Sequence, residues 1–241
     1  MAGTATPAYG TPNWEMIQRW FALDPADDGP FWALNLMKYH EVAQYSDPAA
    51  PAVSGKAADD AYAPRGPLAA VGARIAFFGD VLDQRGGTPA WDRIAIVRYP
   101  SRASFFEMQQ RDDFKDQHVH KEAGMEFTIV MSCLPRATGP KTDTEPDSWV
   151  LTVERGPDLH RGPLPSGVSL VADFDVEGVI VGDERAFDRA RFLRADSDTA
   201  TAAIAELCGQ AEDAHVIVVD RAMDHLVESI EAAETDNAPR G

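Results

Sequence analysis

A set of short matches recurs in the second half of the chain at a nearly constant shift, and this recurrence constrains the fold more than any other feature. The matches keep their order in both halves: Arg65-Gly66-Pro67-Leu68 with Arg161-Gly162-Pro163-Leu164, Gly72 with Gly167, Asp80-Val81 with Asp175-Val176, and Trp91-Asp92-Arg93 with Phe187-Asp188-Arg189. The shift is 95 or 96 residues throughout. Chance similarity in a chain rich in Ala, Asp and Arg is the alternative, but the agreement in shift and order predicts a tandem repeat.

Each half also has the pattern of one α/β unit. Apolar runs at 31–39, 72–82, 91–99 and 127–133 predict strands, and Pro100-Ser101 predicts the start of a helix. With a short helix before residue 72, the order is β-α-β-β-α-β, the ferredoxin-like unit. The second half repeats strand patterns at 149–154, 168–176 (extending toward 181), 187–193 and 214–219, with helices after Ser197 and at about 222–233. Its first two strands lie closer together, which indicates a degenerate copy.

A sheet covered by helices on one face must bury its other face against a second layer. Two repeats in one chain can supply both sheets, so the predicted class is α+β, with tandem ferredoxin-like repeats in an intramolecular dimeric α/β-barrel arrangement. The expected parts are an N-terminal helix and lead-in (1–30), repeat 1 (31–134), a polar linker (135–147), repeat 2 (148–233) and a disordered tail (234–241). Thr11 followed by Pro12 predicts the start of that first helix.

Composition limits the partners and the compartment. The net charge is −17, from 39 acidic and 22 basic residues, which disfavours binding to nucleic acid or anionic membranes. No apolar run approaches the ~20 residues of a membrane span, and residues 1–10 lack the pattern of a signal peptide. Only two cysteines are present, in no motif, so we expect a cytoplasmic protein. A homodimer of tandem chains is compatible with this class.

Strand alternation proposes which side chains face a ligand. In the first strand we expect Leu34 and Leu36 on the helix-packed face, with Ala33, Asn35 and Met37 toward the other sheet. In the second, we expect Ile75 and Phe77 toward the helices, and Arg74, Ala76 and Phe78 inward; in the fourth, Phe127, Ile129 and Met131 toward the helices, and Thr128, Val130 and Ser132 inward. Asn35 and Arg74 would then be polar groups in a cavity between the sheets, although Arg74 could instead pair with an acid or lie at a strand end.

The densest titratable segment is 112–122, and it contains His118 and His120. Histidine exchanges protons near neutral pH, so either residue is a candidate acid or base. In a helix, Phe114, His118 and Glu122 would share one face and His120 would point elsewhere. In an extended segment both histidines would lie on one side and could bind a metal, but no third ligand stands at a diagnostic spacing. Structural or solvent-exposed histidines are the remaining alternative.

The first half resembles a bacterial family named domain of unknown function 1330. The resemblance covers about residues 25–135 and is carried by the segments 33–39, 72–75, 91–92, 97–101 and 118–124. It implies a ferredoxin-like fold of the dimeric α/β-barrel class and no settled activity. Two departures stand out: Lys121 occupies the position where the family more often has arginine, and Leu151-Thr152-Val153-Glu154 stands where the family motif has Asn and Lys. Any chemistry is therefore expected on the first half.

The leading functional hypothesis is an enzyme that acts on a small, partly apolar molecule without a tightly bound organic cofactor, of the oxygenase, isomerase or cyclase class. In this hypothesis His118 or His120 is the general base, while Asn35, Lys38 and Arg74 position an oxygen-bearing substrate. The class is an analogy from the fold, which does not fix function. Two alternatives are a non-catalytic protein that binds or sequesters a small molecule, and a haem- or metal-binding protein.

Overall fold

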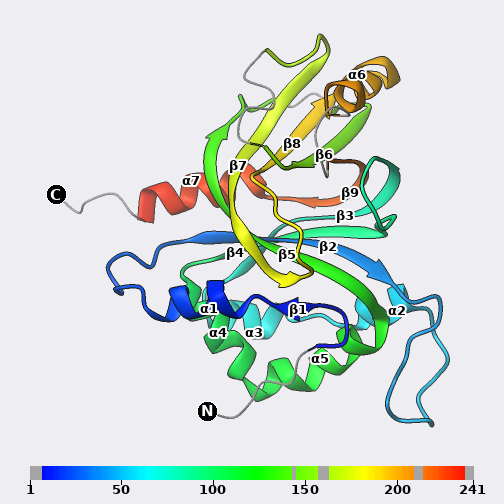
Figure 1. Ribbon diagram of the computed structural model, residues 1–241, viewed down its shortest axis with the longest axis vertical. Helices are drawn as coiled ribbons and strands as arrows, with labels where there is room; N and C mark the ends of the chain where they lie inside the picture. The colour runs from blue at the N-terminus through cyan, green and yellow to red at the C-terminus, as the bar shows by residue number, and fades with distance from the viewer. Residues whose placement is uncertain (1–6, 143–144, 157–162, 209–213, 237–241) are drawn as a thin grey trace.

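A nine-stranded sheet closed into a barrel forms the centre of the protein (Figure 1). The structure is a computed structural model that describes residues 7–142, 145–156, 163–208 and 214–236. The repeat matches at Arg161 and Gly162 therefore lie outside the described residues. The strand order is β1-β7-β5-β2-β4-β3-β9-β6-β8, and an additional β7–β8 pairing closes the ring. β1 (Thr11–Pro12) pairs only with the end of β7.

The strands of the ring divide into two ferredoxin-like repeats with the same order. The first repeat contains β2 (Phe31–Tyr39), β3 (Arg74–Arg85), β4 (Arg93–Tyr99) and β5 (Met125–Thr138). The second contains β6 (Ser148–Glu154), β7 (Val168–Gly182), β8 (Arg189–Ala195) and β9 (His215–Asp224). The orders β5-β2-β4-β3 and β9-β6-β8-β7 both place the first and third strands in the centre. The predicted tandem repeats and intramolecular barrel are confirmed.

Matching hydrogen bonds at the start of β4 and of β8 show how closely the repeats correspond. The Asp92 amide donates to the Met37 carbonyl at 2.8 Å, and the Asp188 amide donates to the Glu154 carbonyl at 2.9 Å. Each aspartate carboxylate also accepts the backbone N–H of the residue two positions after that carbonyl. Asp92 accepts from Tyr39 at 2.8 Å, and Asp188 accepts from Gly156 at 2.6 Å. These bonds are equivalent in both copies and explain the sequence match at this point.

Most helices cover the outer face of the first sheet (Figure 1). They are α1 (Trp14–Phe21), α2 (Gly55–Ala61), α3 (Arg65–Ala70), α4 (Arg102–Gln110) and α5 (Asp112–Gly124). α6 (Asp198–Cys208) packs on the outer face of the second sheet, which lacks a counterpart of α2 and α3 among its described residues. Serine side chains cap α4 and α6 as predicted, because Ser101 and Ser197 accept backbone N–H groups.

The barrel interior is filled with apolar side chains from both sheets. Its fully buried members include Leu34, Ile96, Phe174 and Ile217. α7 (Leu226–Asp236) covers one end, where Leu226 and Ile230 join the cluster and the Trp32 indole donates to the Ser229 hydroxyl at 2.8 Å. The prediction of a cavity between the sheets is therefore wrong, because the described residues fill this space as a packed core.

For β2 and β5, the sequence analysis assigned the alternating side chains to the wrong faces of the sheet. Leu34 and Leu36 face the barrel interior, as do Ile129 and Met131, whereas Ala33 and Val130 pack under the helices. Both faces of these strands are apolar, so alternation separates the faces without telling which layer each face contacts. In β3 a register shift between Ile75 and Phe77 turns Phe77 into the barrel while Ile75 stays on the helix side.

Several element boundaries also differ from the prediction. Thr11 and Pro12 form β1 instead of opening a helix, and the Asn13 side chain caps α1 by accepting from the Met16 amide. β5 continues into the predicted linker, and α7 continues to Asp236, while residues 237–241 lie outside the described part. No helix in the described ranges combines the length and apolar character needed to cross a membrane.

Candidate functional site

The outer face of the first sheet carries a partly exposed strip in its centre. β4 is flanked by β2 and β3, and its inward side chains Ile94 and Ile96 are completely buried. On the opposite face, Ala95 and Val97 remain partly exposed although helices lie over this side of the sheet. We call Ala95 and Val97 the outer strip. Solvent reaches the sheet at this point.

Tyr9 and His118 meet beside the outer strip. α5 places His118 one turn after Phe114 and one turn before Glu122, as the helical alternative predicted. The His118 Nε2 atom lies 3.0 Å from the Tyr9 hydroxyl, and Tyr9 belongs to an apolar cluster against which Ala95 packs. The Thr128 amide donates to the Tyr9 carbonyl and fixes the N-terminal segment over the sheet. One hydrogen bond thus joins the N-terminal segment to α5.

Burial keeps both of these groups uncharged. It lowers the pKa of His118 from 6.5 to about 4, with a smaller effect of the nearby Lys121 charge in the same direction. Burial also raises the pKa of Tyr9 well above its ordinary value, and Glu122 adds to this effect. The second ring nitrogen of His118, Nδ1, is buried and has no hydrogen-bond partner within the described residues. At neutral pH the pair is a neutral imidazole bonded to a phenol.

Lys121 follows His118 on the same side of α5. Its ammonium nitrogen lies 5.7 Å from the ring centroids of both Tyr9 and Tyr62. The Tyr62 ring in turn packs edge-on against His118 and Phe114. Burial lowers the pKa of Lys121, and the Asp59 carboxylate opposes this effect. We call Tyr9, Tyr62, His118 and Lys121 the tyrosine–histidine cluster.

A second polar group anchors α2 beside this cluster. The Tyr39 hydroxyl donates to Asp59 at 2.6 Å, and Arg93 donates to the same carboxylate at 3.1 Å. Arg93 also donates to Asp60 and Asp80, so one buried guanidinium joins α2 to β3 and β4. Because every charge in this group is paired, its role is to hold α2 in place.

The structure separates the residues that the sequence proposed for one site. Asn35 lies on the outer face of β2, opposite Ala95 in register, and its amide donates to the Ala33 carbonyl at 3.0 Å. The Lys38 ammonium forms an ion pair with the Asp92 carboxylate, with 3.1 Å between Nζ and Oδ2. Arg74 is exposed at the start of β3. Only Asn35 therefore adjoins the outer strip, and it does so on the helix side instead of between the sheets.

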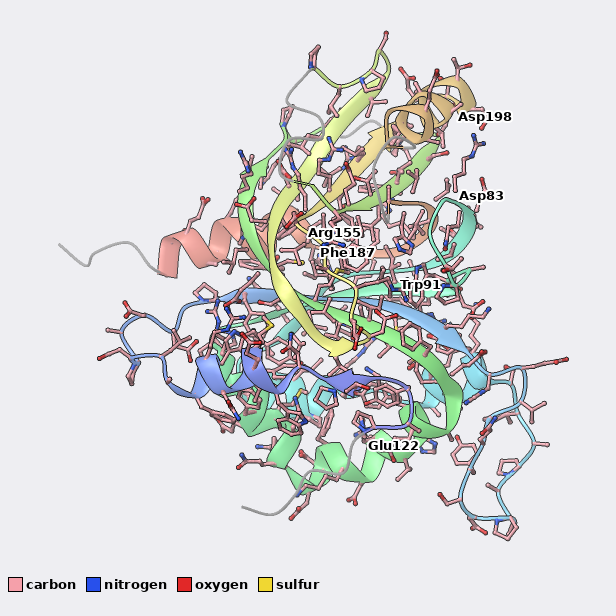
Figure 2. All side chains as sticks on the ribbon, viewed as in Figure 1. Asp83, Trp91, Glu122, Arg155, Phe187 and Asp198 are labelled. Atoms are coloured by element: carbon pink, nitrogen blue, oxygen red, sulfur yellow. The ribbon has the colours of Figure 1, made fainter. Side chains whose placement is uncertain are left out.

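The two histidines point to different surroundings because α5 is helical. His120 Nδ1 lies 2.8 Å from the Tyr45 hydroxyl, in the loop before α2, whereas His118 contacts Tyr9. Within the described residues, no group of three His, Cys, Asp or Glu side chains is arranged to hold a metal ion. Figure 2 shows Glu122, one turn from His118, on the outer helical side of the first sheet, away from Trp91 and Phe187 in the barrel core.

Sequence reasoning placed none of Tyr9, Tyr62 and Lys121 in the site, although Lys121 was noted as a departure from the family that the first half resembles. Lys121 had a usable signal, because a residue three positions after His118 shares its helix face. Tyr9 and Tyr62 had none, since they belong to segments without periodic patterning and reach the cluster through tertiary packing alone.

Comparison with solved structures gives similar chains of low identity. A Rhodopseudomonas palustris protein of unknown function, RPA0582, is 25% identical over 54% of this chain and 98% of its own, with a TM-score of 0.47. A mutant chlorite dismutase from Candidatus Nitrospira defluvii is 9% identical over 86% of this chain and 96% of its own, with a TM-score of 0.44. No family model matches the chain, and no curated protein matches it significantly. The resemblance to domain of unknown function 1330 therefore stays a prediction.

Proposed function

We propose that the chain is an enzyme that moves a proton on a small, partly apolar molecule bound at the outer strip of the first repeat. The observation that carries this proposal is the Tyr9–His118 hydrogen bond of 3.0 Å beside the Lys121 ammonium. It places a neutral base, a neutral acid and a cation next to a partly exposed, otherwise apolar surface. Such a combination is what general acid–base catalysis requires.

The chemistry follows from the protonation states. The low pKa of His118, about 4, keeps its imidazole unprotonated at neutral pH, which is the state that a general base requires. A proton removed from a C–H or O–H group of the substrate would leave negative charge on the substrate, which the Lys121 ammonium would stabilise. The protonated Tyr9 hydroxyl could return a proton at a later step. Deprotonation of this kind is a first step open to cofactor-free oxygenases, isomerases and cyclases alike.

The apolar walls define the substrate class. The rings of Tyr62 and Phe114 contact His118, and Ala95 and Val97 are the partly exposed apolar residues of the outer strip. Asn35, opposite Ala95, is the candidate hydrogen-bonding group for a substrate oxygen. Lys38 and Arg74 are not part of this proposal, because Lys38 holds Asp92 and Arg74 lies at the exposed end of β3.

Hydrogen–deuterium exchange tests the proposal without knowledge of the full reaction. The protein is incubated in D2O with carbonyl probes such as acetylacetone, cyclohexanone and phenylpyruvate, and loss of their acidic C–H signals is followed by NMR. We expect the wild type to accelerate exchange of at least one probe, and His118→Gln to reduce this rate by about 100-fold or more. His120→Gln is the matched control on the same helix and should retain the rate.

Two outcomes would contradict an enzymatic role. If probes bind but none exchanges faster than in buffer, the non-catalytic binding hypothesis replaces it. If His118→Gln and His120→Gln exchange at the wild-type rate, His118 is not the base.

A further inference from the structure

Lys121 differs from the other lysines of the chain in its ion pairing. The chain has five lysines, and four of them lie within 4 Å of a carboxylate: Lys38 with Asp92, Lys56 with Asp80, Lys115 with Asp112, and Lys141 with Glu231. Among the described residues, no carboxylate approaches Lys121 within that distance. In a chain with 39 acidic residues, Lys121 is thus the lysine whose ammonium has no carboxylate within 4 Å among the described residues, and burial lowers its pKa.

Aromatic rings surround the Lys121 ammonium instead. The rings of Tyr9 and Tyr62 lie at equal distances of 5.7 Å from its nitrogen. Such cation–π contacts contribute about 0.5–2 kcal/mol, less than a partly buried ammonium loses by leaving water. A partly buried cation that lacks a carboxylate partner is well suited to an anion supplied from outside, so the missing charge is a recognition feature.

We propose, building on the proposed function, that Lys121 is the anion-binding group of this site and that the ligand is a small monocarboxylate with a flat apolar body. The ammonium would receive the carboxylate, and the rings of Tyr9 and Tyr62 would flank the apolar part. A second negative charge is disfavoured, because Asp59 and Glu122 act on the same cluster and the whole chain carries −17. A flat monoanion therefore fits better than a phosphate or a dicarboxylate.

The test compares three fluorinated aromatic probes by ¹⁹F NMR titration: 4-fluorobenzoate, the uncharged 4-fluorobenzamide and the dianion 4-fluorophthalate. We expect the benzoate to bind about ten-fold or more tightly than the other two. Lys121→Met should remove this preference and leave weak binding of the benzamide unchanged. Lys115→Met, which removes an exposed lysine of the same helix, is the matched control, and Lys121→Arg should keep a preference for the anion.

A measurement on the unmodified protein covers the case in which Lys121→Met does not fold. With selective ¹⁵N labelling of lysine, 4-fluorobenzoate should raise the pKa of one lysine, assigned as Lys121, and leave the other four unchanged. Equal affinity for benzoate and benzamide, a preference for benzoate that survives Lys121→Met, or an unchanged Lys121 pKa would each overturn the inference.

Failure of this inference and failure of the proposed function give different results. Carboxylate binding that depends on Lys121, without proton exchange of any probe, supports the anion site and removes the catalytic role. Exchange of cyclohexanone that depends on His118, together with equal affinity for 4-fluorobenzoate and 4-fluorobenzamide, supports catalysis and removes the anion site.

Discussion

The two repeats share one strand order but differ at the centre of the outer faces of their sheets. Strand register identifies equivalent positions, since Asn35 pairs with Ala95 in the first repeat and Thr152 pairs with Arg191 in the second. Ala95 is small and partly exposed, whereas Arg191 is 3% exposed and binds Glu154. The second repeat thus fills, with an ion pair, the place that the first repeat leaves accessible.

A neighbouring ion pair differs in its acidic partner, because the equivalent arginine of the first repeat, Arg93, donates to Asp80. Arg189 donates to Asp173 on the outer face of the second sheet, and Asp173 is 4% exposed. The equivalent of Asp173 in the first repeat is Phe78, which packs against Arg93. The first repeat therefore leaves Ala95 partly exposed under its helices, where the second repeat, which has no described counterpart of α2 and α3, carries the Arg191–Glu154 pair. At the neighbouring position both repeats have an ion pair, Arg93 with Asp80 and Arg189 with Asp173.

Removal of Arg191 should have the largest effect on stability. Arg191→Met leaves the buried Glu154 carboxylate without its guanidinium, and the free energy of unfolding should fall by about 3–5 kcal/mol in urea denaturation. The double variant with Glu154→Gln should recover most of this loss, because the Glu154 side chain then carries no charge that lacks the Arg191 guanidinium. Lys141→Met, which ends an exposed pair with Glu231, is the control and should cost less than about 1 kcal/mol.

A loss of less than about 1 kcal/mol in Arg191→Met would contradict the idea that this pair replaces a site. It would show that water reaches the outer face of the second sheet as it reaches Ala95 in the first.

His118, which lies on the accessible face of the first repeat, should make the stability of the protein depend on pH. Because the folded pKa of His118 is about 4 and its unfolded value is 6.5, the unfolded chain binds more protons between these values. The contribution of His118 is fully present above pH 6.5 and is lost as the pH falls toward 4. The difference amounts to about 3 kcal/mol at most.

The measurement is the urea unfolding free energy of the wild type and of His118→Gln at several pH values between 4 and 7. The wild type should lose stability more steeply on acidification than the variant, and His120→Gln should follow the wild type. Parallel curves for the wild type and His118→Gln would show that His118 titrates as an exposed histidine.

The features that both repeats share should give equal and smaller effects, measured with Lys38→Met in place because Lys38 also pairs with Asp92. Asp92→Ala and Asp188→Ala each remove a carboxylate that accepts an equivalent backbone N–H, from Tyr39 and from Gly156. Each change should cost about 1–2 kcal/mol in urea denaturation. The double variant should lose the sum of the two, since the sites share no partner. Unequal losses, or a double variant far from additive, would show that the repeats do not stabilise these turns in the same way.

These aspartates also explain why the architecture could be predicted from the sequence. The Trp91-Asp92-Arg93 match works because the structure needs a carboxylate and a buried aromatic residue at the same point of each copy. Apolar runs and serine caps supplied the strands and helices around it. Such signals depend only on neighbouring residues, and the sequence carries them in both halves. Two matching α/β units in one chain were enough to predict the barrel.

The candidate site could be predicted only in part, for physical reasons. Period-2 alternation cannot tell inward from outward in a strand such as β2, where Leu34 and Ala33 are both buried on opposite faces. A bulge such as the one between Ile75 and Phe77 reverses the facing of later residues without a sequence signal. Contacts across long separations, such as Tyr9 with His118, depend on the finished fold.

Tyr9 provides the smallest of these tests and the one most specific to the first repeat. It belongs to the N-terminal segment, which leads into β1 and is held at β7 by the β1–β7 pairing. The Tyr9 hydroxyl lies 3.0 Å from His118 Nε2. Tyr9→Phe keeps the ring beside Lys121 and removes only the hydroxyl, so the free energy of unfolding should fall by about 1 kcal/mol. The pKa of His118 should stay well below 6.5 in this variant, because burial is the main cause of its lowering and the ring still covers the imidazole.

An NMR titration of the His118 ring checks this point, with His120→Gln used to assign the signal. A His118 pKa that returns to 6.5 in Tyr9→Phe would mean that the hydroxyl, and not burial, keeps the imidazole neutral. The proton transfer proposed for the pair would then require Tyr9 and His118 to be treated as one titrating unit.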